Sequence, residues 1–459
     1  MNSSDATSPW RARLNTPLLR LLLLGALLLM LMIPASMIAG VVTEREARRD
    51  EAVADIIGKW GGAQTLVGPV LRVPFVTRTR YTNSEGKIIE NLEEDAAYFL
   101  PRSLSVKATA ATELRRRGIF EVPVYAARLQ LQGEFAPPDF SAWNVRPQDV
   151  DWKRAELMLG LSEPRALHAD ASLVWNGQPL RFKPSSGQSG SWNPAGIHAA
   201  LGAELEQVLN PDGAVFSLGF AVNGADALYF SPTAEETHAS LGADWPHPSF
   251  QGGWLPAGRE ISDQAFSAHW SVSYLGRDYP QRWRDSAPAT EAIGKAYFGA
   301  RFSTPVDHYS MAERITKYAV MTLVFTFAVI WLTEILSGAR AHLIQYAFTG
   351  AALCLFGLLQ LSFAEHFGFN WAFAVAAAAV VLMVTLYSRS MLRSARRALV
   401  VGGVLSGLYL YLYMILQAED YALLGGSLAL FAGLATAMYL TRKIDWAAPA
   451  SAPLTSQQP

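Results

Sequence analysis

YAVMTLVFTFAVIWLTEIL (residues 318–336) is an apolar run that contains a single charged residue, Glu334, and four similar runs follow it before residue 441. A helix rises about 1.5 Å per residue, so about 20 residues are needed to cross a hydrocarbon core about 30 Å thick. The sequence therefore predicts a transmembrane bundle of five helices over residues 317–440. The four later spans are expected at residues 344–363, 371–387, 399–416 and 421–440.

The loops between these spans alternate in charge, and this alternation predicts their orientation. Arginine and lysine occur after the first span at Arg340, after the third at residues 389–397, and after the fifth at residues 442–443. The other two loops contain Glu365 and His366, and then Glu419 and Asp420, without lysine or arginine. Loops rich in lysine and arginine stay in the cytoplasm, so the chain before residue 317 is expected on the opposite side.

An N-terminal span is predicted at residues 18–42, because an uncharged run from residue 21 to residue 42 follows Arg11, Arg13 and Arg20. The apolar part of a cleaved signal peptide is typically about 7–15 residues long, so an uncleaved signal anchor is the favoured interpretation. The prediction is then six spans in a 1+5 arrangement with both termini in the cytoplasm. Residues 1–17 and 441–459 are expected to be polar cytoplasmic tails, the second of them disordered.

The middle of the chain, residues 43–316, explains why the average composition resembles that of a soluble protein, with 17% charged residues and a net charge of −1. This segment is long enough to bury a core of its own. The single cysteine, Cys354, lies in a predicted span, so no intramolecular disulfide is possible. The expected environment of the chain is a lipid bilayer, and no nucleic-acid partner is expected.

The extracytoplasmic segment changes from a helical to a strand pattern near residue 61. Val53, Ile56, Ile57 and Trp60 have helical spacing, which predicts an amphipathic helix over residues 43–60 that ends at a Gly-Gly pair. Alternating and β-branched residues then predict a mainly β domain made of two packed antiparallel sheets, with a short helix at residues 197–208. Strands are expected at residues 66–80, 98–110, 119–135, 154–161, 171–175, 214–222, 228–230, 236–242 and 264–274.

Several stretches resemble the CreD family of inner membrane proteins. They include WGGAQTLVGPVL (60–71), RRGIFEVPVYAARLQLQGEF (116–135) and LSFAEHFGFNWAF (361–373), together with residues 245–281, 306–327 and 344–353. The resemblance covers nearly the whole chain. It implies a bacterial inner membrane protein with a large periplasmic domain and a role in cell-envelope integrity, stress response and colicin tolerance. It does not imply a molecular activity.

Sequence motifs for catalysis are absent. The chain contains no HExxH, G-x-S-x-G, G-x-x-x-x-G-K-[ST] or G-x-G-x-x-G motif, and its eight histidines do not have the spacing of helical metal ligands. We therefore expect no catalytic residue, no cofactor and no metal site.

The first group of candidate functional residues is Asp307, His308, Tyr309 and Arg314, with Glu313 and Lys317 nearby, where the soluble segment meets the first span of the bundle. One hypothesis makes these residues a segment that couples the two parts of the protein or contacts lipid headgroups. The alternative is an ordinary interfacial belt of tyrosine and cationic side chains.

Two further candidates are acidic. Glu365 and His366 are adjacent in a predicted outer loop, where they could titrate near neutral pH or bind a cation, or could simply be solvated. Glu334 is a candidate because an acid inside a span is costly unless it is paired or reaches water, and it lies within about one turn of the interface. Trp245 and Trp254 are candidates for a partner-binding surface, and the alternative is that they anchor a sheet edge in the core.

The leading functional hypothesis is a non-enzymatic envelope protein whose periplasmic domain binds or senses an envelope component or another inner membrane protein. The first alternative is a transporter or channel, although the spans contain few charges to line a pathway. A less favoured alternative is a membrane-embedded enzyme that acts on lipid-linked envelope intermediates. The sequence does not indicate the oligomeric state.

Overall fold

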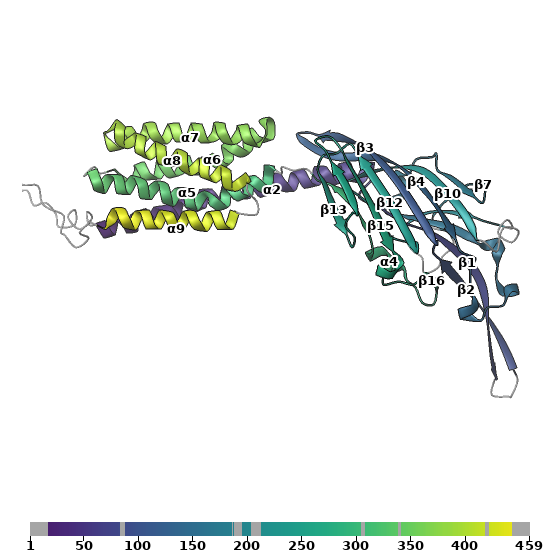
Figure 1. Ribbon diagram of the computed structural model, residues 1–459. Coiled ribbons are helices and arrows are strands. Elements are labelled where there is room, and N and C mark those ends of the chain that lie inside the picture. Colours follow the sequence, from purple (N-terminus) through teal and green to yellow (C-terminus); the bar gives the residue numbers. More distant parts are fainter. Residues whose placement is uncertain are drawn as a thin grey trace, which may run out of the picture. The chain divides into compact units, whose positions relative to one another are not determined.

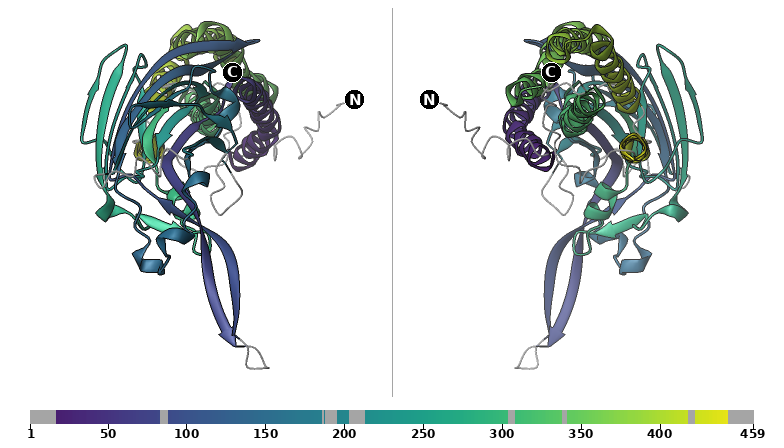
Figure 2. Two further views of the ribbon diagram at one scale, coloured as in Figure 1. Left: turned by 90° about the vertical axis from the view of Figure 1, so that its right-hand side faces the viewer. Right: turned by 90° about the vertical axis from the view of Figure 1, so that its left-hand side faces the viewer.

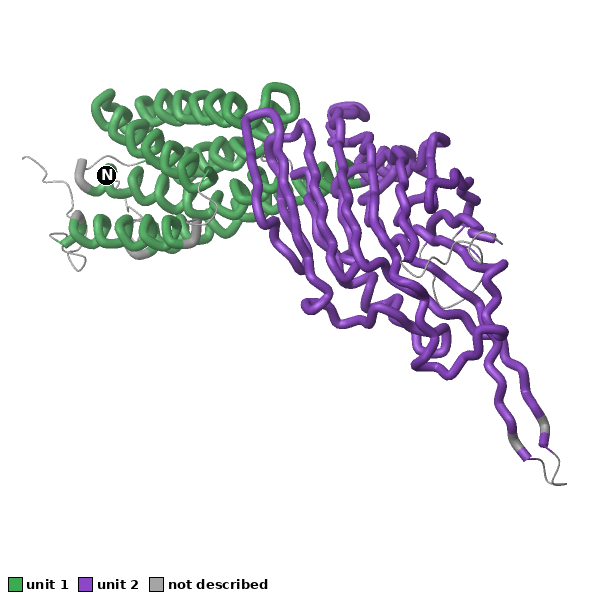
Figure 3. Tube along the Cα trace, turned by 45° about the vertical axis from the view of Figure 1, so that its right-hand side comes forward, with its two compact units in different colours: residues 1–50, 306–459 green, residues 51–305 purple. Residues whose placement is uncertain are grey.

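In a computed structural model the chain forms apolar helices and two β-sheets (Figure 1). The structure describes residues 17–82, 88–185, 187, 195–202, 213–303, 308–337, 341–417 and 422–442. The chain divides into two compact units, residues 1–50 with 306–459 and residues 51–305, which we call the helical unit and the β unit (Figure 3).

The helical unit contains the predicted membrane spans. Among the described residues, five helices are long and apolar enough to cross a membrane, and they are α2, α5, α6, α7 and α8. The remaining predicted span is α9, whose described apolar stretch, Leu424–Tyr439, is shorter. The bounds are α2 (Pro17–Trp60), α5 (His308–Ser337), α6 (Leu343–Phe367), α7 (Phe369–Leu392), α8 (Ala395–Gln417) and α9 (Ala422–Thr441).

The core of the helical unit is built by antiparallel neighbours. Helix α6 packs against α5 and α7, and α7 packs against α8, as the short connections between them require. Aromatic side chains fill the middle, where the ring of Tyr409 lies 4.5 Å from that of Phe356. Helix α5 begins at His308, before the predicted start of the bundle at Lys317.

The β unit contains two sheets, as predicted. The first has the order β13 (Pro248–Gly252), β17 (Phe298–Phe302), β11 (Ala227–Phe230), β1 (Gln64–Thr82), β5 (Glu156–Leu161), β9 (Gly196–Ala200), β8 (Lys183–Pro184), with β2 (Ile88–Phe99) on β1 and β16 (Arg282–Arg284) on β2. The second has the order β14 (Gly258–Ile261), β15 (Phe266–Ser273), β12 (Glu236–Ala243), β3 (Ser103–Arg117), β4 (Phe120–Phe135), β10 (Ala214–Ala225), β6 (Ser172–Trp175), β7 (Gln178–Leu180). The pairs β1–β11 and β3–β12 are parallel, so the sheets are not wholly antiparallel.

One apolar core lies between the two sheets. Strand β15 alternates strictly between buried and exposed residues, as a strand does when one face is covered. Its buried Trp270 belongs to the same core as Leu71 of the first sheet and Leu129 of the second. A smaller core contains Val70, Tyr98 and Trp283, and it is closed by Ile293 of the short helix α4 (Thr290–Lys295).

Two parts of the β unit differ from the prediction. The helix expected at residues 197–208 is wrong where the structure describes it, because β9 pairs antiparallel with β5 along its whole length; residues 203–212 lie outside the described residues. The strand expected at residues 98–110 is two strands, since β2 ends at Phe99 and β3 begins at Ser103, on either side of Pro101.

A two-stranded ribbon extends from the first sheet (Figure 2). Strands β1 and β2 pair as far as Thr82 and Ile88, whereas β5 stops pairing with β1 at Arg72. Arg78 of the ribbon donates hydrogen bonds to Asp149 Oδ1 from Nε at 2.9 Å and from Nη2 at 2.8 Å. This contact ties the ribbon to the body of the β unit.

The predicted amphipathic helix is the C-terminal part of α2, which runs without interruption from the first span to Trp60. Its apolar face, Val53, Ile56, Ile57 and Trp60, packs against Val122, Val124 and Ala225 of the second sheet. The predicted face of this helix is therefore confirmed.

Candidate functional site

Glu334 is the buried acid of the helical unit, with 3% of its surface exposed. Arg20 Nη2, from α2, lies 3.0 Å from Glu334 Oε1 and 2.8 Å from Oε2. The Tyr346 hydroxyl of α6 donates to Glu334 Oε2 at 3.1 Å, and the backbone N–H of Ala341 donates to Oε1. We call Arg20, Glu334, Ala341 and Tyr346 the Glu334 cluster; it joins α2, α5 and α6.

In the Glu334 cluster, the Glu334 carboxylate and the Arg20 guanidinium each have an opposite charge and hydrogen-bond partners. A buried carboxylate is costly unless an opposite charge and hydrogen bonds compensate for the lost water. The carboxylate accepts three different donors, and Arg20 also donates to the Ala341 carbonyl at 2.6 Å. The sequence left pairing and access to water open as ways to tolerate Glu334, and the structure shows pairing with a cation from another helix.

Glu365, at the far end of α6, lies in a second cluster. The Tyr309 hydroxyl of α5 donates to Glu365 Oε1 at 3.0 Å, and Arg45 Nε of α2 lies 4.0 Å from the same oxygen. We call Arg45, Tyr309 and Glu365 the Glu365 cluster. It brings together Tyr309 and Glu365, which the sequence pattern placed in two separate groups.

The remaining sequence candidates of the helical unit are His366, Arg314, Asp307 and His308, with Glu313 and Lys317 nearby. The His366 side chain is exposed, with its ring 6.3 Å from that of Phe367. Arg314 is half-buried on α5, and Lys317 forms an exposed ion pair with Glu313 at 3.0 Å. Asp307 lies outside the described residues, as does the side chain of His308, the first residue of α5.

Trp245 and Trp254, the candidate partner surface, are half-buried in the β unit. The Trp245 indole N–H donates to the Ser303 carbonyl at 3.0 Å, and both rings pack on the main core. The Trp254 carbonyl accepts a hydrogen bond from Trp270 at 3.2 Å. These contacts favour the interpretation in which both residues anchor the sheet edge.

Sequence reasoning missed the side chains of Arg20, Arg45 and Tyr346 and the backbone of Ala341. Arg20 was considered only as part of the positive flank of the first span, and Arg45 was not singled out. The predicted orientation was the available signal, since it places Arg20 and Glu334 at one side of the membrane and Arg45 and Glu365 at the other. Among the residues that the structure covers, no group of three or more histidine, cysteine or acidic side chains is arranged to bind a metal.

Helices of membrane-spanning length, polar clusters where helices meet, and a separate two-sheet unit define a multi-pass membrane protein with a large β domain. The family model described as "Inner membrane protein CreD" matches residues 16–447. The chain is 30% identical over 428 residues to Inner membrane protein CreD of Escherichia coli (strain K12), covering 92% of each protein. The chain belongs to the CreD family of inner membrane proteins.

Proposed function

We propose that this protein is a non-enzymatic component of the bacterial inner membrane that supports cell-envelope integrity under stress. Its β unit binds an envelope component or another inner membrane protein in the periplasm, and its helical unit responds to that binding. The observation that carries the proposal is helix α2, which contributes side chains to both polar clusters of the helical unit and to the core of the β unit.

Helix α2 is suited to relay a change from one unit to the other. Arg20 and Arg45 take part in the Glu334 and Glu365 clusters, and Trp60 packs on the second sheet. The Trp60 indole N–H donates to the Tyr125 carbonyl at 3.2 Å, and the Arg115 guanidinium lies 3.7 Å from the Trp60 ring centre. Pro34 lies between Arg20 and Arg45 and removes one backbone hydrogen bond there, whereas no proline interrupts residues 35–60, so the helical hydrogen bonds continue from Arg45 to Trp60.

The transporter hypothesis requires a polar route through the spans, and the described interior is mainly apolar. The hydroxyls of Thr322, Thr326 and Thr349 donate to carbonyls of their own helices. A cavity of about 20 Å³ lies between α2, α5, α6 and α8, which is room for about one water molecule.

The relay is tested by a matched pair of variants in cells that lack their own family member. We expect W60A to reduce survival under envelope stress at equal protein level, because it removes the packing of α2 on the second sheet. K59A changes the exposed neighbouring side chain, whose ion pair with Asp55 is on the surface, and is expected to behave as wild type. A Gly-Ser-Gly insertion after Asp50 breaks the helix without changing either core, and is expected to act as W60A does. Wild-type survival with both W60A and the insertion would contradict the relay.

Binding by the β unit is tested separately by photocrosslinking in intact cells. Leu92 of the ribbon and Leu275 next to β15 are exposed, at 57% and 80%. A photoreactive residue at one of these positions is expected to capture a defined envelope component, and capture by neither would remove the binding part of the proposal.

A transporter and a membrane-embedded enzyme would each give a distinct experimental outcome. The C354A variant has no cysteine, so single cysteines can be placed along the spans. A continuous stripe of water-reactive positions would establish a transport pathway. The enzyme hypothesis is tested with alanine variants of Glu334, Glu365 and His366. If each variant protects the envelope as well as the wild type does, the enzyme hypothesis is excluded.

A further inference from the structure

A small cavity of about 20 Å³ lies inside the helical unit, where α2, α5, α6 and α8 meet. One water molecule needs about 10–15 Å³ of such space, so the cavity has room for one water and for no larger ligand. The residues that line it are uncharged and most are apolar, among them Ala35, Ile38, Ile315 and Leu412. An ion bound there would have no opposite charge to compensate for its lost hydration, so the cavity suits a neutral molecule.

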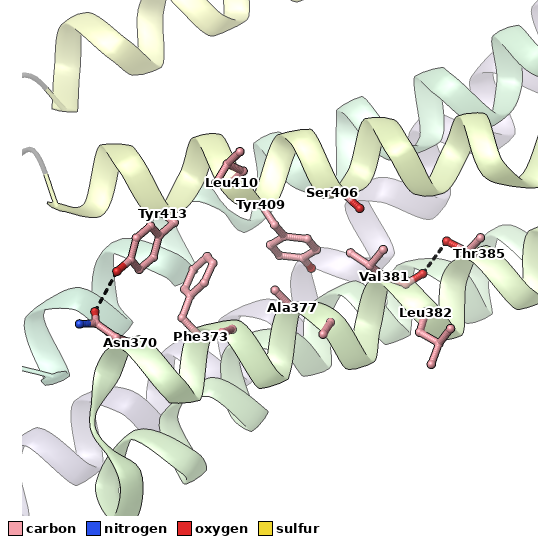
Figure 4. A pocket seen from close by; sticks show the side chains of 12 residues that line it. Asn370, Phe373, Ala377, Val381, Leu382, Thr385, Ser406, Tyr409, Leu410 and Tyr413 are labelled. Carbon is pink, nitrogen blue, oxygen red and sulfur yellow. Dashed lines mark hydrogen bonds between the residues drawn. The ribbon is translucent and has the colours of Figure 1, made fainter.

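Tyr409 of α8 brings a hydroxyl without a partner to this place. Its side chain lines both the small cavity and a groove of about 630 Å³ between α7 and α8. Figure 4 shows the groove, in which the Tyr413 hydroxyl is bonded to Asn370 whereas no hydrogen bond joins Tyr409 to the other residues drawn. The Tyr409 hydroxyl is fully buried, has no hydrogen-bond partner among the described residues, and interacts electrostatically with the Cys354 thiol of the cavity lining. A buried hydroxyl does not reach the open groove, so the small cavity is the space in which it finds a partner.

Two further polar atoms of the lining come from α5 and α6. Thr322 Oγ1 donates to the Tyr318 carbonyl at 3.3 Å, and Cys354 Sγ lies 3.8 Å from the Leu31 carbonyl, to which it donates. A hydroxyl or a thiol that donates its own hydrogen can still accept another hydrogen bond. Tyr409 therefore offers a donor, and Thr322 and Cys354 offer acceptors. Three partners of this kind are typical of a buried water.

We propose that this cavity binds one structural water molecule, which accepts a hydrogen bond from Tyr409 and donates to Thr322 and Cys354. The water joins α8 to α5 and α6 at the level where Ala35 of α2 lines the cavity. Pro34 precedes Ala35 and has no N–H to donate to the Met30 carbonyl, so α2 lacks one of its own hydrogen bonds in this turn. The water thus adds contacts between helices where the backbone of α2 is weakest.

The first test is the sign of the stability change in Y409F, which removes the hydroxyl and keeps the ring. A hydroxyl that is bonded to water is worth about one hydrogen bond, so Y409F is expected to raise the unfolding equilibrium constant of the full chain about fivefold. Removal of a hydroxyl without a partner would instead stabilise the chain. Titration of mixed micelles with a denaturing detergent measures the constant. Y439F makes the same change at a tyrosine that is 61% exposed, and is expected to stay within about twofold of the wild type. A Y409F chain that is as stable as the wild type, or more stable, would overturn the proposal.

The second test displaces the water and keeps Tyr409. Gly357 lines the cavity, and a Cβ atom added to it would lie 3.6 Å from Ile38 Cγ2, which is an ordinary contact, so the methyl group of G357A fits and fills the space. The Tyr409 hydroxyl then has no partner, and Y409F in the G357A background is expected to lower the unfolding constant at least about fivefold. The matched background is G403A, where a Cβ would meet nothing within 4 Å and Y409F is expected to destabilise as it does in the wild type. A change of the same sign in both backgrounds would overturn the proposal.

The third test detects the water directly, by solid-state NMR of the full chain in lipid bilayers with ¹³C-labelled tyrosine. Magnetisation transfer from water protons to the Tyr409 signal, which is identified by its loss in Y409F, is expected in the wild type and in G403A but not in G357A. Absence of this transfer in the wild type would overturn the proposal. The ionic composition tests the alternative occupant: a wild-type chain that is more stable in sodium chloride than in choline chloride would assign the cavity to a cation instead of water.

Discussion

At the residue scale, the helical unit tolerates an internal acid because its partner comes from a helix more than 300 positions earlier in the chain. Glu334 and Arg20 are 314 residues apart, and their contact connects the N-terminal span to the C-terminal bundle. A charge of either sign is expensive in this environment when it stands alone, so the two residues depend on each other.

We therefore predict that E334Q destabilises the helical unit by about 3 kcal/mol, because it leaves the Arg20 guanidinium without its counter-charge. The measurement is the unfolding free energy in mixed micelles titrated with a denaturing detergent. Replacing Arg20 by methionine in the same chain should recover part of the loss. The control is E313Q in the exposed Glu313–Lys317 pair, for which less than about 1 kcal/mol is expected. Equal effects of E334Q and E313Q would contradict the prediction.

A second residue-scale prediction concerns Asp149 at the base of the ribbon. Hydrogen bonds from Arg78 and then from Arg146 lower the pKa of Asp149 below its ordinary value of 3.8. A carboxyl with a depressed pKa in the folded state contributes stability above its unfolded pKa, and this contribution is lost as the pH falls through the folded pKa.

The wild-type chain should therefore lose stability from about pH 4 downward more steeply than D149N, which lacks the titrating group. Chemical unfolding of the full chain at a series of acidic pH values, followed by tryptophan fluorescence, measures the two slopes. D170N, at an exposed aspartate of the β unit, should keep the wild-type slope. A D149N slope equal to that of the wild type would exclude the effect.

Individual candidate residues could be predicted where a side chain differs in character from its neighbours in the sequence. Glu334 was identified because an acid in an apolar span stands out, but its partner was not, since pairing depends on how helices pack. Glu365 and Tyr309 were both identified and placed in separate groups for the same reason. Trp245 and Trp254 were candidates either for a partner surface or for anchors of a sheet edge, and only the structure shows that their rings pack on the core.

At the element scale, the packing of α7 on α8 depends on one glycine that spacing alone did not identify. Gly403 and Gly407 have the small-xxx-small spacing that is typical of helix packing, yet a Cβ at either position would meet nothing within 4 Å. Gly402 is the residue at the close approach, where its missing side chain leaves room for Thr385. A small-residue pattern shows that close packing is possible, and the neighbouring helix decides which residue uses it.

This difference gives a matched pair of variants on adjacent residues. G402A should destabilise the helical unit by about 1–3 kcal/mol, because the added methyl group overlaps Thr385. G403A should stabilise it by up to about 1 kcal/mol, because alanine has the higher helix propensity and the space is open. Thermal unfolding of the purified full chain gives the sign of each change. The assignment is wrong if the two variants shift the midpoint in the same direction.

Elements with a strong period were predicted, and elements that depend on pairing were not. Strand β4 and the apolar face of α2 follow from alternation and helical spacing in the sequence. Strand β2 was missed over most of its length because its acids, ENLEED, look like a loop; they are tolerated because this part of the ribbon is exposed to water. Strand β9 was predicted as a helix because alanine favours helices, and the ladder with β5 overrides that preference.

At the scale of the whole molecule, apolar length and loop charge predicted the division of the chain into a membrane part and a β part. Both signals reflect the bilayer as a solvent, which acts on every residue of a span alike and does not depend on which helices touch. The orientation of the spans and the crossing by α9 rest on those same signals, and they lead to the last prediction.

The orientation of the spans and the membrane crossing by α9 are tested with single cysteines in the C354A background, which are labelled with a membrane-impermeant maleimide. Leu255 of the β unit is 76% exposed, and L255C is expected to react in intact spheroplasts. Arg396, exposed at the start of α8, should react as R396C only after the membrane is opened, because positively charged loops remain inside. Arg442 follows α9, so two crossings by α8 and α9 place R442C on the same side as R396C. If R442C instead reacted in intact spheroplasts while R396C did not, α9 would not cross the membrane and the chain would have five spans. If R396C reacted in intact spheroplasts and L255C did not, the orientation of the whole chain would be the opposite of the one predicted.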